Sequence, residues 1–534
     1  MSIPAGDASR GRILDRRLKL SDRLRTFTHG GRDYALTSAV PLTYLAASPG
    51  LLALLRRFSS PRRLADLVEA PPGPAVESFV ATLHRVGVLV DADSPDPVHS
   101  FRGGGGGSGS GNATRTLCLY PARSCNLRCV YCYAASGQSA GSRMSPEDAA
   151  VAIDDFFATL GDGVRGAILK FHGGGEPTTN FPVMEAAWAR FRELARRRGV
   201  APRVCAITNG TFGPEVLRTL LEPEWRLEVS YDGPRQGIQR PAASNGESRD
   251  RVVANLLALR RAGKVLRTRA TLTRDGLASM RDLVDDAAEI GIHQVQVEPA
   301  SVVNRSADPL DGPPAPAEFA EAFLDGLGHA LRHGVELATA AWSHTRVGDG
   351  RYCGALSGSR ALTPDGFVSA CTETCDGTDP DDPFIVGRLD LAGRRFEILP
   401  ERERSLRSRV GYDLPGCRDC FLVDTCAGGC AKRAHAQTGD ALVRDEDFCA
   451  RSLVVNPSIV ADLADGRLLP DAGWQPVEAR LDPSESSLPG VWGRLVALVP
   501  PFARSRWNAD PSRRPFLPVD GKAPRFFHLP ASEK

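Results

Sequence analysis

The feature that most constrains the fold is a regular alternation of strand-like and helix-like patterns between Arg115 and about Ala341. Amphipathic segments such as Ser248–Ala262, with Ser248 as an expected N-cap, separate the strand-like segments. Six β/α repeats of this kind predict an α/β fold whose parallel sheet curls into a partial (β/α)6 TIM-like barrel. Functional groups of such folds gather at the carboxyl ends of the strands. The strand-like segments are Thr116–Tyr120, Ala167–His172, Arg203–Thr208, Arg226–Tyr231, Leu266–Thr273 and His293–Glu298.

Length and charge narrow the classes of function. A chain of 534 residues suggests two or three domains. Its 66 Lys and Arg nearly balance 64 Asp and Glu, leaving a formal charge of +2, so bulk charge favours neither nucleic acid nor a membrane surface as a partner. Met1–Arg10 is polar, and no stretch approaches the roughly 18 apolar residues of a spanning helix. We therefore expect a cytoplasmic protein that binds neither nucleic acid nor membrane.

Composition shifts divide the chain into five segments. Residues 1–100 carry helix-like periodicity that ends in a short strand at Gly87–Val90, an order that suits a winged-helix-like domain. Gly and Ser make up nearly all of Gly103–Gly111, so residues 101–112 are expected to be a flexible linker. The strand–helix repeats occupy residues 113–345, and a cysteine-rich region occupies residues 346–456. Residues 457–534 are rich in Pro and Arg and are expected to be a partly disordered tail.

Thirteen cysteines in a reducing compartment point to metal binding or redox chemistry, because disulfides are rare there. Cys125, Cys129 and Cys132 follow the first strand-like segment, which places three thiolates on one loop at the barrel mouth. A [4Fe–4S] cluster usually takes four thiolates, so three leave one iron open. The alternative, a structural zinc site, is usually closed by four ligands. Cys118 and Cys205 stand apart and are expected to be small buried core residues.

Further motifs fall at successive strand ends. His172-Gly-Gly-Gly-Glu176-Pro ends the second strand, Thr208-Asn-Gly the third and Ser230-Tyr-Asp-Gly the fourth. With Tyr131 just before Cys132, these motifs resemble the signature of the radical S-adenosylmethionine (SAM) superfamily. The resemblance implies that the cysteine triad binds a [4Fe–4S] cluster whose open iron holds SAM, and that reductive cleavage of SAM gives a 5′-deoxyadenosyl radical that abstracts a substrate hydrogen. The SAM-binding residues that it implies are Tyr131, Gly174, Gly175, Glu176, Thr208, Asn209, Ser230, Asp232 and Arg269.

The later cysteines form a second pattern, which resembles the seven-cysteine SPASM extension of radical SAM enzymes. The resemblance implies two auxiliary [4Fe–4S] clusters, one on Cys417, Cys420, Cys426 and Cys449 and the other on Cys353, Cys371 and Cys430. A zinc ribbon is the alternative for the 417–430 stretch. The fourth ligand of the second cluster stays open between an open site, Cys375 and His344. Sulfatase-maturing members carry Asp where Thr372 stands, so sulfatase maturation is not expected; Glu373 is a weaker candidate base or a solvated acid.

Roughly residues 30–92 are similar in element order to the peptide-recognition domain of many radical SAM peptide maturases, which binds a leader peptide as an added strand at a sheet edge. DNA binding is the alternative, because Arg56, Arg57, Arg62 and Arg63 form a basic run. The resemblances imply a maturase that forms a thioether or carbon–carbon crosslink, or another oxidation, in a ribosomally made precursor peptide, with a reductant such as flavodoxin or ferredoxin. Maturation of a folded protein or a cofactor precursor is one alternative, and a metal-stabilised winged-helix regulator without catalysis is another.

Overall fold

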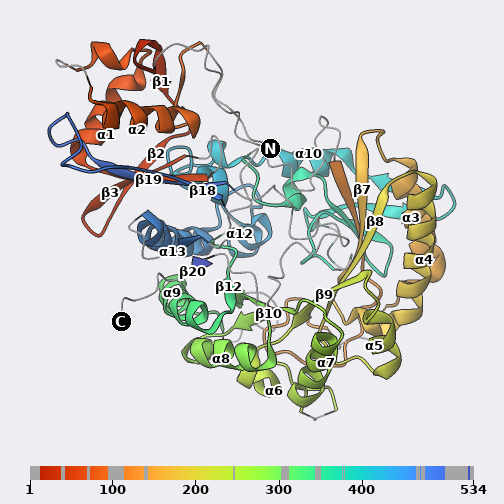
Figure 1. The fold of residues 1–534 in the computed structure, drawn as a ribbon. Coiled ribbons are helices and arrows are strands. Elements are labelled where there is room, and N and C mark those ends of the chain that lie inside the picture. The colour runs from red at the N-terminus through yellow and green to blue at the C-terminus, as the bar shows by residue number, and fades with distance from the viewer. Residues whose placement is uncertain are drawn as a thin grey trace.

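Figure 1 shows the fold in a computed structural model of the chain, with a curved sheet lined by helices and a smaller unit formed by the N-terminal segment. The six predicted strands all form, each within a few residues of its expected bounds. They are β6 (Ala113–Leu119), β7 (Val164–Phe171), β8 (Ala201–Thr208), β9 (Trp225–Ser230), β10 (Arg267–Leu272) and β11 (Gln294–Pro299). The structure describes residues 13–37, 42–68, 72–93, 113–136, 142–244, 247–301, 312–342, 350–375, 377, 379, 381–464, 469–470, 475–499 and 527–528.

The central sheet extends beyond the six predicted strands. Strands β6 to β11 pair in parallel and in chain order, and β12 (Glu336–Ala338) joins β11 in parallel. At the other end β13 (Arg360–Leu362) joins β6 in parallel, followed by the antiparallel strands β14 (Phe367–Ser369), β15 (Ile385–Asp390) and β16 (Arg395–Ile398). The order β12-β11-β10-β9-β8-β7-β6-β13-β14-β15-β16 confirms a mixed α/β fold with a large parallel sheet.

Helices follow the strands and lie on the outer side of the curved sheet (Figure 1). They are α3 (Pro146–Ala158), α4 (Phe181–Arg197), α5 (Pro214–Leu220), the short α6 (Gln236–Gln239), α7 (Arg249–Arg261), α8 (Met280–Ile290) and α9 (Pro316–His333). Helix α7 begins as predicted, but Ser248 does not cap it. The Ser248 backbone is helical rather than extended, and the Ser248 hydroxyl donates to the Arg240 carbonyl at 2.7 Å.

The barrel core is filled by aromatic and aliphatic side chains between sheet and helices. The rings of Phe157 and Phe191 meet edge to face with centroids 4.9 Å apart, and Trp225 stacks on Phe171. Cys118 on β6 and Cys205 on β8 are buried, as expected for core residues. This packing fixes the strands, so the loops at their carboxyl ends start from rigid positions.

The N-terminal unit combines two helices with short strands. These elements are β1 (Leu18–Leu20), β2 (Arg25–His29), β3 (Arg32–Thr37), β4 (Leu42–Ala47), α1 (Pro49–Arg56), α2 (Pro74–Arg85) and β5 (Leu89–Asp91). Both helices bury an apolar face in a separate core that includes Leu51, Leu55, Phe79 and Leu83. Strand β5, which includes the end of the predicted Gly87–Val90 segment, pairs with β1.

Part of residues 457–534, expected to be a partly disordered tail, forms ordered strands. Strands β18 (Gln475–Leu481) and β19 (Gly493–Val499) form a hairpin that adds to the N-terminal unit, giving a five-stranded sheet in the order β18-β19-β4-β3-β2. Leu481 and Leu495 are buried in its core, which explains why a Pro- and Arg-rich segment still orders here. Strand β17 (Leu469–Pro470) pairs with β20 (Phe527–His528). The predicted linker, 101–112, lies outside the described residues.

The cysteine-rich region connects the barrel to the N-terminal unit. It contains α10 (Pro400–Ser408), α11 (Val423–Cys426), α12 (Ala431–Thr438) and α13 (Glu446–Ala464), which crosses the expected boundary at 456. Phe27 stacks on Phe421 at 4.4 Å, and Arg23 Nη1 lies 3.0 Å from Asp424 Oδ1. Within the described ranges no helix is long and apolar enough to cross a membrane. Short 3-10 helices cover Ile13–Asp15, Arg57–Ser59, Leu64–Asp66, Pro177–Asn180, Gly233–Arg235, Leu277–Ser279, Gly354–Ser357 and Gly411–Asp413.

Candidate active site

A cavity of about 230 Å³ opens at the carboxyl ends of the parallel strands. Its wall combines the cysteine loop after β6, the glycine motif after β7 and the ends of β8 to β11. Thr372, Glu373 and Arg433 of the cysteine-rich region complete the wall. The structure therefore brings together Cys125, Cys129, Cys132, Tyr131, Gly174, Gly175, Glu176, Thr208, Asn209, Ser230 and Arg269. Of the residues predicted for this site, Asp232 is the one that does not line the cavity.

The cysteine loop is held in place by backbone pairing with the segment that follows α6. Val130 N donates to the Gln239 carbonyl at 3.0 Å, and Arg128 N donates to the Pro241 carbonyl at 2.8 Å. Burial raises the pKa of the Cys125 thiol to about 11 and that of Cys129 to about 12. Because thiols bind metal as thiolates, loading this loop with iron releases protons.

Two glycines let the wall approach the cysteine loop closely. A Cβ on Gly175 would lie 2.3 Å from the Ser124 carbonyl oxygen, which is backbone and has no room to move. A Cβ on Gly174 would lie 2.6 Å from Cys375 Sγ. Only glycine therefore fits at either position, which agrees with the role that the sequence suggests for this motif.

Glu176 is buried in the cavity wall, and most of the hydrogen-bonding capacity of its carboxylate is taken up by donors of the protein. Its Oε1 accepts hydrogen bonds from Thr178 N, Thr178 Oγ1 and Thr208 Oγ1, the latter two at 2.7 Å. Its Oε2 accepts one from Asn209 N at 2.7 Å. Burial raises the pKa of Glu176, although these donors work in the opposite direction. Oε2 has capacity for one further donor from a ligand.

Asn209 links the end of β8 to the cysteine loop. Its side-chain amide donates to Asn126 Oδ1 at 2.8 Å and lies 4.0 Å from Cys125 Sγ. Its Oδ1 accepts from Thr211 N at 3.0 Å. The amide is thus fixed in one orientation beside the first thiol of the triad.

Ser230 and Arg269 reach the cavity from neighbouring strands. The two residues are register partners between β9 and β10, so a hydroxyl at the end of β9 stands beside a guanidinium from within β10. This arrangement suits a carboxylate, for which a guanidinium is the preferred partner.

Asp232 has a different place from the one predicted. Its carboxylate is enclosed and forms an ion pair with Arg240, with Arg240 Nε 2.9 Å from Oδ2. It also accepts hydrogen bonds from the Tyr131 hydroxyl and, at 3.0 Å, from Thr271 N. Burial lowers the pKa of Arg240, but the charge of Asp232 more than offsets this and raises it above the usual value. Arg240 itself lines the cavity; no sequence motif marks it.

Charged residues from outside the predicted set face the same cavity. Glu298 ends β11, while Glu373 and Arg433 come from the cysteine-rich region. Burial lowers the pKa of Arg433, but the nearby charges of Glu373 and Glu298 outweigh it, so the guanidinium stays charged. Arg433 lies three residues after Cys430. The cysteine spacing is the only pattern in this stretch, and it does not indicate a role for Arg433.

Four of the later cysteines converge on a second, smaller cavity of about 20 Å³. Cys417, Cys420, Cys426 and Cys449 all line it, together with Arg444. Burial raises the pKa of all four thiols, to about 12 for Cys426. This is the set of four that the SPASM resemblance assigns to one auxiliary cluster.

The remaining three predicted cluster ligands, Cys353, Cys371 and Cys430, lie close enough for their charges to interact. After burial, the main causes that raise the pKa of Cys371 are Glu373, Cys430 and Cys353. Cys375 instead packs with Cys118, Tyr120 and Ala361, against the glycine motif. His344, the other candidate for a fourth ligand, lies outside the described residues.

The donor chemistry of these sites fits iron–sulfur clusters. Each site offers soft thiolate ligands, with three on the loop at the cavity and four around the small cavity. In the described residues, one group brings three His, Cys, Asp or Glu ligand atoms within 4.8 Å of one another, and it contains no cysteine. No three of the described thiols therefore lie as close together as the ligands of a single ion.

Comparison with known proteins gives a family match for part of the barrel. Residues 119–287 match the radical SAM superfamily. The chain is similar to an AdoMet-dependent heme synthase of Nitratidesulfovibrio vulgaris, with 26% identity over 348 residues, covering 61% of this chain and 90% of that protein. The solved structure of anSMEcpe with bound AdoMet and Kp18Cys peptide has a TM-score of 0.50 at 16% identity, covering 66% and 99% of the two chains. Streptococcus suis SuiB bound to precursor peptide SuiA has a TM-score of 0.44 at 13% identity, covering 81% and 99%.

The matched residues run from the end of β6 into α8. They include the whole cysteine loop, the glycine motif and the ends of β8, β9 and β10, which are the parts that enclose the cavity. We conclude that residues 119–287 form a radical SAM domain.

Proposed function

We propose that the chain is a radical SAM maturase of a ribosomally made peptide, in which Cys125, Cys129 and Cys132 hold a SAM-binding [4Fe–4S] cluster. The two groups of later cysteines hold two auxiliary [4Fe–4S] clusters. One observation carries the proposal: the cavity of the radical SAM domain is closed by Thr372, Glu373 and Arg433 of the cysteine-rich region. A substrate in this cavity therefore lies between the SAM-binding loop and the auxiliary clusters.

The chain's own residues supply binding and orientation. When bound, the cluster and SAM supply reductive cleavage of SAM to a 5′-deoxyadenosyl radical, which takes a hydrogen atom from the substrate. Glu176 Oε2 would accept a hydrogen bond from the SAM ammonium, and Arg269 with Ser230 would hold its carboxylate. Gly174 and Gly175 keep the wall close to the cysteine loop.

The substrate side of the cavity is polar. Glu298, Glu373 and Arg433 face it from two regions of the chain. A guanidinium donates to carbonyl oxygens and carboxylates accept amide N–H groups, so this set suits a peptide backbone better than an apolar substrate.

The N-terminal unit is the proposed binding site for a leader peptide. An extended peptide binds by adding a strand to a free sheet edge. In the part of the chain that the structure describes, β19 already covers β4, so β4 is an interior strand. The leader therefore adds to β2 or to β18, the two outer strands of this sheet.

Peptide-dependent SAM cleavage tests the proposal. The full chain, with its clusters assembled without oxygen, is given reductant, SAM and synthetic copies of short peptides encoded near its gene. We expect 5′-deoxyadenosine to form together with a peptide that has lost hydrogen mass, and peptide binding to slow hydrogen exchange in β2 or β18. Cleavage of SAM with no change in peptide mass would reject the substrate. Binding without protection of residues 13–93 or 475–499 would reject the leader site alone.

A second candidate is maturation of a cofactor precursor. It is favoured by the similarity to the heme synthase, which extends over 90% of that protein at 26% identity. Arg433, which faces the same cavity, also suits a substrate that carries a carboxylate. An iron tetrapyrrole offered in place of the peptide in the same assay separates the two candidates, because only the true substrate is altered in mass.

A further inference from the structure

A separate group of metal-ligating side chains lies on the outer helices of the barrel. Asp285 lies on α8, and His329 and His333 lie on the last turns of α9. None of the three lines either of the two cavities described above. The proposed function therefore does not use them.

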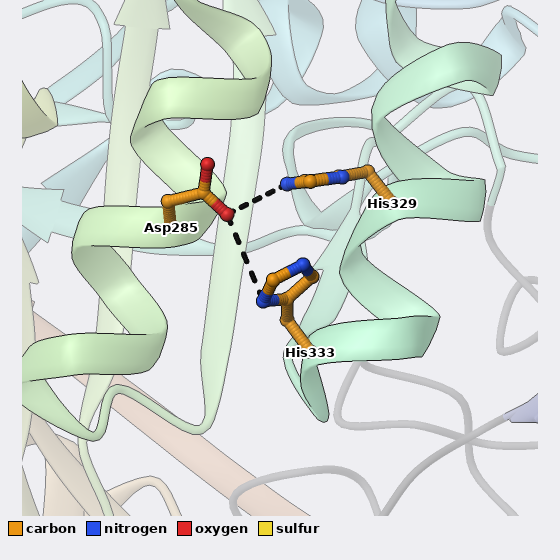
Figure 2. A group of neighbouring side chains, drawn as sticks. All are labelled: Asp285, His329 and His333. Carbon is orange, nitrogen blue, oxygen red and sulfur yellow. Dashed lines mark hydrogen bonds and ion pairs between the residues drawn. The ribbon is translucent and has the colours of Figure 1, made fainter.

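Figure 2 shows both imidazole rings turned toward one carboxylate oxygen of Asp285. His329 Nε2 lies 2.6 Å from Asp285 Oδ1, and His333 Nδ1 lies 3.7 Å from the same atom. The two histidines are four residues apart on one helix, so they occupy the same face. All three ligand atoms lie within 4.8 Å of one another, and no other group of three such ligands in the described residues does so.

The spacing matches one coordination sphere. Zinc binds imidazole nitrogen and carboxylate oxygen at about 2.0–2.2 Å, so ligand atoms on one ion lie roughly 3–4 Å apart. Small side-chain rotations bring the three atoms to such distances. Without an ion, only His329 lies within hydrogen-bond distance of Asp285 Oδ1; an ion between the three side chains would attract both rings and the carboxylate.

The scaffold under the three ligands is already ordered. Val284 and Ala287 of α8 and Leu327 and Ala330 of α9 are buried between the helices and the barrel. Binding an ion here therefore requires no ordering of the backbone, which keeps its entropic cost low. The ligands themselves remain accessible, with Asp285 51% and His333 42% exposed, so an ion can enter from solvent.

We propose that Asp285, His329 and His333 form a site for a divalent late transition-metal ion, with Zn²⁺ as the ion of choice. Two imidazoles and one carboxylate favour such ions over Mg²⁺ and Ca²⁺, which prefer oxygen ligands. Three protein ligands leave at least one position open to water or to an outside group. The ion ties α8, which precedes β11, to α9, which follows it.

Zinc binding to the full chain with its clusters assembled tests the site. Because the clusters already fill the cysteine sites in this protein, zinc cannot bind there. Zn²⁺ is titrated without oxygen against a competing chromophoric chelator. We expect one additional zinc per chain in the wild type and at least a tenfold loss of affinity in H329Q/H333Q. The matched control is H84Q, which removes a histidine from another His–Asp pair, His84 with Asp91, that has no second histidine. That variant should keep wild-type affinity.

A second readout does not depend on any variant folding. Crystals of the wild-type protein soaked with ZnCl₂ should give an anomalous peak at the zinc edge between Asp285 Oδ1 and the two rings. Equal zinc affinity in the wild type and H329Q/H333Q would overturn the site. So would an anomalous map with zinc elsewhere and none here.

Discussion

The Asp232 carboxylate and the Arg240 guanidinium form a buried ion pair next to the cysteine loop, with Arg240 Nε 2.9 Å from Asp232 Oδ2. Arg240 also stacks over the Tyr131 ring at 5.2 Å, and Tyr131 precedes the last cysteine of the triad. The segment around Arg240 pairs with the cysteine loop through its backbone. The ion pair therefore positions the loop, and its carboxylate does not line the cavity.

Breaking one half of this ion pair should be costly. R240M leaves the Asp232 charge buried without its partner, so we expect a loss of about 3–5 kcal/mol in the free energy of unfolding. The double variant R240M/D232N removes both charges and should recover part of that loss. R388M, which breaks the exposed pair of Arg388 and Glu397, is the control and should cost no more than about 1 kcal/mol. Chemical unfolding measures all of them; similar losses in R240M and R388M would contradict the assignment.

The two glycines of the cavity wall should respond differently to added side chains. G174A places a methyl group 2.6 Å from Cys375 Sγ and Cβ, so C375G in the same chain should restore much of the SAM affinity that G174A removes. G175A meets the backbone of Ser124, which no substitution can move away. We expect each single variant to bind SAM about 5- to 150-fold more weakly, as overpacking typically costs about 1–3 kcal/mol.

Equilibrium SAM binding measures the effect, with G161A as the control because a Cβ there meets nothing within 4 Å. Rescue of G175A by C375G would show that the clash is not what weakens binding.

Iron content should separate the ligand cysteines from the others. If all three clusters are [4Fe–4S], the chain holds about twelve iron atoms. C426A should lower this to about eight, because Cys426 lines the small cavity with three other thiols. C205A and C375A should leave it unchanged, because Cys205 is a core residue and Cys375 packs against Tyr120. Iron and sulfide analysis after anaerobic reconstitution tests this; a fall of about four iron in C375A would make Cys375 the missing ligand.

Sequence patterns predicted the parts of the fold that local periodicity controls. The six parallel strands follow from apolar runs separated by amphipathic helices, and the cavity follows from motifs at their carboxyl ends. Arg240 and Arg433 escaped prediction because their roles depend on which segments meet in space. Asp232 was predicted to bind SAM because its motif lies at a strand end, whereas in the structure its carboxylate pairs with Arg240.

The β18–β19 hairpin shows a second limit of sequence reasoning. Its composition, with Pro and Arg nearby, resembles a disordered tail, and its partner strand β4 lies more than 400 residues earlier. No local pattern reveals a pairing over that distance, because the hydrogen bonds and the buried leucines that stabilise it come from another part of the chain.

The pH at which Lys264 loses its proton gives an independent check on the barrel. Lys264 Nζ donates to the Trp225 carbonyl at 2.8 Å, and partial burial lowers its pKa to about 8, against 10.5 for an ordinary lysine. The unfolded chain therefore binds more protons between pH 8 and 10.5, so the cost of burying this charged lysine disappears as pH rises through that window. Amine labelling followed by mass spectrometry should show a midpoint near pH 8 at Lys264, and K264R identifies its peptide. A midpoint above 10 would contradict the buried position.

Removing the C-terminal hairpin should loosen the N-terminal unit and leave the barrel intact. A chain that ends at residue 470 loses Leu481 and Leu495 from the core around Leu51 and Phe79, and each buried leucine contributes about 1.5–3 kcal/mol. It also exposes the edge of β4, which β19 otherwise covers. Hydrogen exchange should therefore speed up at least tenfold in β3 and β4 but not in β7 and β8, which pair within the barrel. L495A in the full chain should give a smaller change in the same strands, and unchanged exchange in both variants would show that the N-terminal unit folds without the hairpin.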